Sequence, residues 1–191
     1  MKEIEDLYTY YYPVQDEQLR GELIRLTSIR RLKKHEYIMH QEEEDTRICF
    51  LRSGVCGAYE IYPDGRTIWL SIVDQPSRII VGGLGPNDPY SPVNVIMLTP
   101  GMVFTICMED IMRLQNEYPE VISFYNRILL KEYETQWQIK NMLYMDAAED
   151  RYEWFLANHP GTIDKISHKC IASYLHMSPV TLSRVRNKAG I

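Results

Sequence analysis

The sequence predicts an α+β fold in which an antiparallel β jelly-roll barrel is followed by a long helix and a C-terminal helix-turn-helix. Three observations carry this prediction: short β-rich runs over residues 28–106, helical spacing of apolar residues after Pro119, and two capped helices within residues 167–188. These observations divide the chain into residues 1–118, residues 119–146 and residues 147–191.

The first part begins with a short amphipathic helix, because Leu19, Leu23 and Leu26 have helical spacing within residues 15–26. Seven β-rich runs follow, at 28–33, 37–40, 47–51, 55–62, 67–73, 78–81 and 102–107. Asp64-Gly65 predicts a hairpin between the fourth and fifth runs. Short strands with regular turn signals indicate an antiparallel sandwich or a jelly-roll barrel.

Residues 82–100 interrupt the strands with three glycines and four prolines. A long loop inside a compact barrel is often a binding element, although a plain connecting loop has the same composition. If a small molecule binds here, the candidate effector-binding residues are Gly83, Tyr90, Ser91 and Asn94.

The long helix carries two apolar stripes. The first stripe is Ile122, Tyr125, Leu129, Tyr133 and Trp137, and the second is Val121, Phe124, Ile128, Ile139 and Met142. Two apolar stripes need two partners, which we interpret as the barrel of the same subunit and the same helix of a second copy. The alternative is a single long core helix in a monomer.

Charge is distributed unevenly along the chain. The net charge is −5, from 21 Lys and Arg against 26 Asp and Glu. Residues 165–191 contain five Lys and Arg and no acid, so they carry +5 and the rest carries 16 − 26 = −10. This asymmetry suits a basic DNA-contacting module on an acidic body, whereas a basic tail that only solubilises would not need the apolar pattern found there.

The remaining composition favours a cytoplasmic protein that is not an enzyme. Residues 1–7 lack the apolar core of a secretion signal, and no apolar run is long enough to span a membrane. The four cysteines are scattered, which predicts reduced thiols; Cys49 and Cys56 could sense redox state, but packing in a strand core is the better interpretation. No metal-ligand cluster, phosphate loop or nucleophile motif is evident, and no cofactor is expected.

Residues 167–188 have the pattern of a helix-turn-helix. Ser167 is a good N-cap for a first helix, and Ser178-Pro179 starts a second helix with Pro in its preferred first position. Between them, His176 stands where a turn glycine is usual, and His enters the left-handed region more readily than most residues. The interior positions are all apolar, with a small residue at the helix crossing: Ile171, Ala172, Leu175, Met177, Leu182 and Val185.

If Leu182 and Val185 face inward, a DNA-reading face points outward on the second helix. It consists of Val180, Ser183, Arg184 and Asn187. Arg184 can donate two hydrogen bonds to guanine, and Val180 can pack against a thymine methyl group. Ser178 and Thr181 suit phosphate oxygens, and Lys169, Arg186 and Lys188 add attraction to the DNA backbone. The alternative is a plain helical hairpin with a basic surface.

The order of these parts resembles the Crp/Fnr family of transcription regulators. The resemblance rests on residues 48–54 (ICFLRSG) with Asp64-Gly65, on residues 148–152 (AEDRY), and on residues 171–175 (IASYL) with 178–184 (SPVTLSR). It implies a cyclic-nucleotide-binding-like sensor barrel with N-terminal helices over 1–118, a dimerisation helix over 119–146 and a DNA-binding domain over 147–191. It also implies a homodimer that binds an inverted-repeat operator on double-stranded DNA, with RNA polymerase as a candidate partner.

Departures from the family pattern restrict which effector and which DNA bases are expected. Members that bind cyclic AMP clamp it with a Gly-Glu pair and a later Arg-Ser or Arg-Thr. Residues 82–99 contain no Glu, Arg or Lys, which argues against cyclic AMP in the usual mode. Many relatives carry Glu where this chain has Val180, so different bases are expected. The effector, the operator and the direction of regulation are left open. The alternative function is a small-molecule-sensing signalling protein whose helix-turn-helix docks a protein partner.

Overall fold

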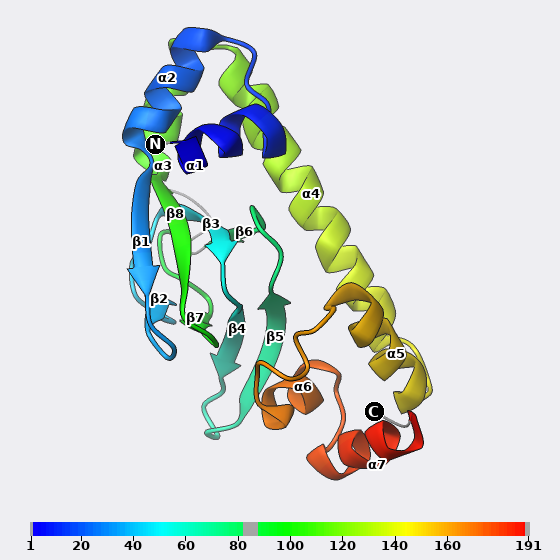
Figure 1. Cartoon of the computed structure of the whole chain (residues 1–191). Helices are drawn as coiled ribbons and strands as arrows, with labels where there is room; N and C mark the ends of the chain where they lie inside the picture. Colours follow the sequence, from blue (N-terminus) through cyan, green and yellow to red (C-terminus); the bar gives the residue numbers. More distant parts are fainter. Residues whose placement is uncertain (1, 82–87, 190–191) are drawn as a thin grey trace.

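The structure, a computed structural model, describes residues 2–81 and 88–189. A β-sandwich with N-terminal helices comes first, a long helix runs beside it, and three shorter helices lie at the far end (Figure 1). The helices are α1 (Lys2–Asp6), the π-helix η1 (Leu7–Tyr11), α2 (Glu17–Leu26), α3 (Met108–Gln115), α4 (Glu120–Leu143), α5 (Ala148–Asn158), α6 (His168–Tyr174) and α7 (Pro179–Ala189). The strands are β1 (Ser28–Leu32), β2 (Tyr37–Met39), β3 (Arg47–Ser53), β4 (Cys56–Ile61), β5 (Thr67–Val73), β6 (Ile79–Val81), β7 (Asn94–Met97) and β8 (Gly101–Cys107).

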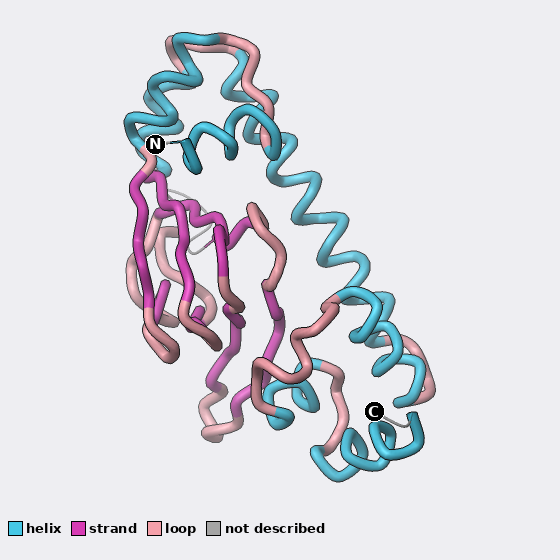
Figure 2. The backbone as a smooth tube through the Cα atoms, viewed as in Figure 1, coloured by secondary structure: helices cyan, strands magenta, loops and turns pink. Residues whose placement is uncertain are grey.

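The strands form two antiparallel sheets of four strands each, with the orders β1-β8-β3-β6 and β2-β7-β4-β5. Figure 2 shows the two groups of strands in magenta. The predicted antiparallel jelly roll is confirmed; it is a sandwich rather than a closed barrel, because the edge strands of one sheet do not pair with those of the other in the part of the chain that the structure describes. The hairpin between β4 and β5 is confirmed, and its Gly65 has a φ of 83°.

The first sheet is buried on both faces, which explains the continuous apolar run of β3. Ile48 and Phe50 pack against the N-terminal helices, α3 and the first half of α4, whereas Cys49 and Leu51 face the interior of the sandwich.

Cys49 and Cys56 are fully buried, and burial raises the pKa of the Cys49 thiol to about 12. Because redox chemistry needs the thiolate, this burial supports packing rather than sensing.

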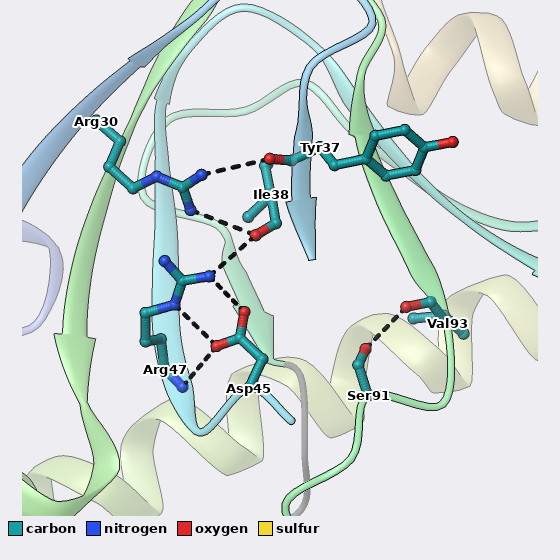
Figure 3. Close-up of polar contacts among 7 residues, drawn as sticks. All are labelled: Arg30, Tyr37, Ile38, Asp45, Arg47, Ser91 and Val93. Atoms are coloured by element: carbon teal, nitrogen blue, oxygen red, sulfur yellow. Dashed lines mark hydrogen bonds and ion pairs between the residues drawn. The ribbon is translucent and has the colours of Figure 1, made fainter. Parts of the chain in front are cut away.

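Two arginines join the sheets at one edge of the sandwich (Figure 3). Arg30 on β1 donates to the carbonyl oxygens of Tyr37 and Ile38 on β2, at 3.3 Å each. Arg47 on β3 donates to the same Ile38 oxygen at 3.2 Å and is held by Asp45. The short strand β2 is thus tied to the opposite sheet by side chains as well as to β7 by its own ladder.

Two segments contain helices or a strand that the residue patterns did not predict. Residues 2–11 form the helices α1 and η1, whose Leu7 and Tyr8 are fully buried against the first sheet. Within the segment expected to be a loop, Asn94–Met97 is the strand β7. None of the described helices is both long and apolar enough to cross a membrane.

Candidate nucleic-acid interface

The two C-terminal helices α6 and α7 begin at the capping residues that the sequence predicts. The Ser167 hydroxyl oxygen accepts a hydrogen bond from the Cys170 amide at 3.2 Å, and the Ser178 hydroxyl oxygen accepts one from the Thr181 amide at 3.0 Å. Each bond satisfies an amide that the helix itself leaves unpaired. His176 has a φ of 52°, so it occupies the left-handed region expected of a turn residue at this position.

The interior of this helix pair is apolar and closely packed. Ile171, Ala172, Leu175 and Leu182 are completely inaccessible to solvent, and Val185 is 2% exposed. Because Leu182 and Val185 hold one side of α7 against α6 and α5, the opposite side of α7 is fixed outward.

The outward side of α7 forms an open, exposed face. Val180, Ser183, Arg184 and Asn187 are exposed on it, together with Pro179 and Lys188. Val180 is 79% exposed, so its apolar side chain is available to a partner from outside the described chain. In Figure 1 this helix lies at the end of the molecule farthest from the N-terminal helices, with the sandwich between them.

The other predicted DNA-contacting residues differ in exposure and in their hydrogen-bond partners. Lys169 is exposed, and Lys188 pairs with Glu149 on α5 at 3.0 Å. Arg186 is half-buried, and its guanidinium donates to His168 Nε2 at 2.6 Å. Ser178 and Thr181 face each other at the start of α7, with 2.8 Å between their hydroxyl oxygens.

Arg151 ties the helix pair to the long helix. It belongs to the AEDRY segment, and its Nε donates to the Leu175 carbonyl oxygen at 2.9 Å, at the end of α6. Its Nη1 donates to the carbonyl oxygens of Met145 and Asp146, in the link after α4. Arg151 therefore caps the C-terminal end of α6 and fixes the link between α4 and α5.

The helix pair also contacts the sandwich, an interface that the sequence analysis did not find. Asp74, directly after β5, accepts hydrogen bonds from His159 Nδ1 at 3.0 Å and from Thr162 Oγ1 at 2.6 Å. Burial alone would raise the pKa of the Asp74 carboxyl group, but these two donors outweigh burial and lower the pKa. The Trp69 amide of β5 donates to the Ser173 hydroxyl oxygen at 3.2 Å, so β5 and α6 are in direct contact.

The two apolar stripes of α4 have different surroundings. Every residue of the second stripe is buried within the subunit, with exposed fractions between 0% and 8%. In the first stripe, Tyr125 is half-buried and the other four residues are exposed. Leu130, which lies beside them, is exposed as well. The exposed fractions are 50% for Ile122, 45% for Leu129, 62% for Leu130, 65% for Tyr133 and 52% for Trp137. An apolar face of this size has no partner within the described chain.

A cavity of about 210 Å³ lies between the sandwich and α4. The sandwich supplies residues of β4, β5, β6 and β7 to its lining, and α4 supplies Glu132 and Gln136. Burial raises the pKa of the Glu132 carboxyl group, against smaller opposing effects of Gln136 and Arg78. Arg78 itself lines a separate cavity of about 80 Å³, together with Asp74 and His159.

The structure does not bring the predicted effector-binding residues together in this cavity. Tyr90 is exposed, the Ser91 hydroxyl donates to the Val93 carbonyl oxygen at 2.8 Å (Figure 3), and Asn94 is hydrogen-bonded to Gln41. Gly83 lies outside the described residues. Within the described part of the chain, no group of His, Cys, Asp and Glu side chains is arranged to hold a metal ion.

Comparisons with known proteins agree with this architecture. Residues 29–118 match the family described as the cyclic nucleotide-binding domain. No curated protein sequence matches the chain.

Solved structures that resemble most of the chain include three described as regulators or named as FixK2. FixK2 from Bradyrhizobium japonicum is 16% identical, with a TM-score of 0.73 over 85% of this chain and 83% of its own. The c-di-GMP responsive global regulator CLP from Xanthomonas campestris is 14% identical, with a TM-score of 0.69 over 92% of each chain. A transcriptional regulator assigned to the Crp/Fnr family from Eubacterium rectale is 15% identical, with a TM-score of 0.68 over 91% of this chain and 82% of its own. At these identities the likeness concerns the fold alone: residues 29–118 match the cyclic nucleotide-binding domain family, and the chain as a whole has the fold of these three structures.

Proposed function

We propose that the chain is a sequence-specific, DNA-binding transcription regulator of the Crp/Fnr type. The observation that carries the proposal is the outward face of α7, on which Val180, Ser183, Arg184 and Asn187 are exposed side by side. A helix whose opposite side is fixed by a buried core can enter the major groove of DNA as a rigid reader. The resemblance to FixK2, CLP and the Eubacterium rectale regulator supports the same function.

In this proposal, Arg184 reads guanine with two hydrogen bonds and Val180 packs against a thymine methyl group. Ser178, Thr181, Lys169, Arg186 and Lys188 contact the DNA backbone. Lys188 would exchange its pairing with Glu149 for a phosphate, a small cost because surface ion pairs contribute little.

The regulator acts as a homodimer. The exposed stripe of α4 supports this assembly, because a second copy would cover Leu129, Tyr133 and Trp137 of one subunit with the same residues of the other. The two recognition helices would then read an inverted repeat whose half-sites are about 34 Å apart. Under this proposal residues 1–118 sense, residues 119–146 dimerise and residues 147–191 bind DNA, and RNA polymerase is a candidate partner.

The test starts from duplexes that the full chain selects from a random pool. Arg184→Ala should weaken binding to the selected duplex by about 5- to 150-fold for each half-site, so that the two losses multiply in the dimer, and should relax the preference at one base pair per half-site. Arg113→Ala is the matched control, because Arg113 is an exposed arginine on α3 that pairs with Asp110. Affinity for the selected duplex should also fall steeply with salt. A flat salt profile with unchanged affinity of Arg184→Ala would favour a helix pair that docks a protein.

A further inference from the structure

The cavity between the sandwich and α4 has an apolar wall and one acidic corner. The sandwich contributes Cys56, Ala58, Leu70, Ser71, Val73, Ile79, Ile80, Val93 and Val95. Only the Ser71 hydroxyl interrupts this apolar lining. Glu132 is the one charged residue among the described residues that line the cavity.

The carboxylate of Glu132 is incompletely paired. Its Oε1 accepts a hydrogen bond from the Gln136 side-chain amide at 2.6 Å, one helical turn along α4. Its Oε2 is inaccessible to solvent and has no hydrogen-bond partner among the residues that the structure describes. An unpaired buried oxygen of this kind is costly, so its position beside an apolar cavity points to a partner that is supplied from outside the chain.

This arrangement disfavours an anionic ligand. A cyclic phosphate would lie in a cavity that offers a carboxylate and no cation, and it would lose the charge-assisted bonds that phosphates require. Arg78 acts on Glu132 only as a minor opposing charge, after burial and the Gln136 hydrogen bond, and its side chain lines the neighbouring cavity beside Asp74 rather than this one.

We propose that the cavity binds a small apolar molecule with one protonated amine, with the amine donating to Glu132 and the apolar body packing on the sandwich residues. The amine is the effector class of the regulator described above, so the inference rests on the proposed function. An ammonium group supplies the donor that Oε2 lacks and compensates the buried charge. A cavity of roughly 150 Å³ accommodates benzene, so about 210 Å³ suits one ring with a short aminoalkyl arm.

The experiment measures ligand binding to the full chain by isothermal titration calorimetry, without DNA. The probes are benzylamine and phenethylamine, their neutral counterpart 2-phenylethanol, the anion 3-phenylpropanoate, and cyclic AMP. We expect at least one amine to bind at least about tenfold more tightly than 2-phenylethanol, since a charge-assisted hydrogen bond is stronger than a neutral one. The two anions should bind more weakly than 2-phenylethanol.

Three variants locate the site. Glu132→Gln keeps the shape of the side chain and should weaken amine binding by about tenfold or more, with 2-phenylethanol unchanged. Glu134→Gln is the matched control, because Glu134 is an exposed acid two residues away on the same helix and does not line the cavity. Ala58→Leu should weaken binding of both the amine and 2-phenylethanol by filling the cavity, and a thermal melt checks that it folds.

Several results would overturn the inference: no amine binds better than 2-phenylethanol, Glu132→Gln binds the amine as the parent chain does, or cyclic AMP binds most tightly. Duplex binding is measured separately. A chain that selects DNA but prefers no amine refutes the ligand class alone, whereas a chain that binds the amine but not DNA refutes the regulator.

Discussion

The contact between Asp74 and the C-terminal helices should be a large contributor to stability. Asp74→Ala removes the acceptor for His159 Nδ1 and Thr162 Oγ1, and the Asp74 side chain is only 8% exposed. A hydrogen bond to a charged group contributes about 1.5–3 kcal/mol, so two such bonds give about 3–6 kcal/mol. Water can enter the adjoining cavity of about 80 Å³ and solvate the donors left behind. We therefore expect a loss near the lower end, about 3 kcal/mol.

The assay is urea unfolding followed by tryptophan fluorescence, since Trp69 and Trp154 flank this interface. The control is Asp64→Ala in the exposed β4–β5 hairpin, where the pair with Arg66 should contribute at most about 1 kcal/mol. If Asp74→Ala destabilises the chain no more than Asp64→Ala does, the contact with His159 and Thr162 is not energetically important and the reasoning is wrong.

The same contact has a defined pH dependence. Because the pKa of Asp74 is lowered in the folded chain, its contribution is complete above the unfolded-state pKa of about 3.9. The contribution is lost as pH falls through the lower folded-state value. The difference in stability between the parent chain and Asp74→Ala should therefore shrink as pH falls below about 4. A difference that grows from about pH 5 to about pH 3 would contradict this sign.

Three further predictions concern the cap, the link and the dimer. Ser178→Ala removes the N-cap of α7 and should cost about 1 kcal/mol, seen as a lower melting temperature together with weaker DNA binding. Arg151→Ala leaves carbonyl groups at the end of α6 and after α4 unpaired and should destabilise the chain by about 1–3 kcal/mol in urea, with Arg151→Lys restoring only part of the loss. The double change of Tyr133 and Trp137 to Ser should convert a dimer to a monomer in sedimentation equilibrium, whereas Tyr90→Ser, at a similarly exposed tyrosine that does not belong to α4, should leave the dimer intact. An unchanged dimer in the double variant would place the subunit contact elsewhere.

Local patterns allowed the C-terminal part to be predicted in detail. Ser167, Ser178 and Pro179 act within one helical turn of their position, so capping can be inferred from neighbouring residues alone. The two stripes of α4 were separable for the same reason, because helical periodicity assigns each residue to a face. Which stripe packs within the subunit could not be inferred, since both are apolar and only the position of the sandwich distinguishes them.

Features that depend on distant segments were missed. The strand Asn94–Met97 lies among prolines and pairs with β2 and β4, so its partners rather than its composition make it a strand. Residues 2–11 carry acids and tyrosines that resemble an exposed segment, although Ile4, Leu7 and Tyr8 have helical spacing that could have indicated α1 and η1. Nothing in the sequence marked Glu132 as a site residue, because a single glutamate on a long helix normally faces water. Its importance depends on the sandwich that packs over it.

The position of Glu132 along α4 has a mechanical consequence. The 24 residues of α4 span about 36 Å, and Glu132 lies near the middle, about 18 Å from either end. α4 can therefore tilt as a rigid rod, like a lever, about a point beside the cavity. A tilt of about 10° at that point displaces the end beside α5 by roughly 3 Å, since the arm is about 18 Å long. Two such levers crossing in a dimer would change the separation of the two α7 helices by up to twice that amount, enough to move them out of step with successive major grooves.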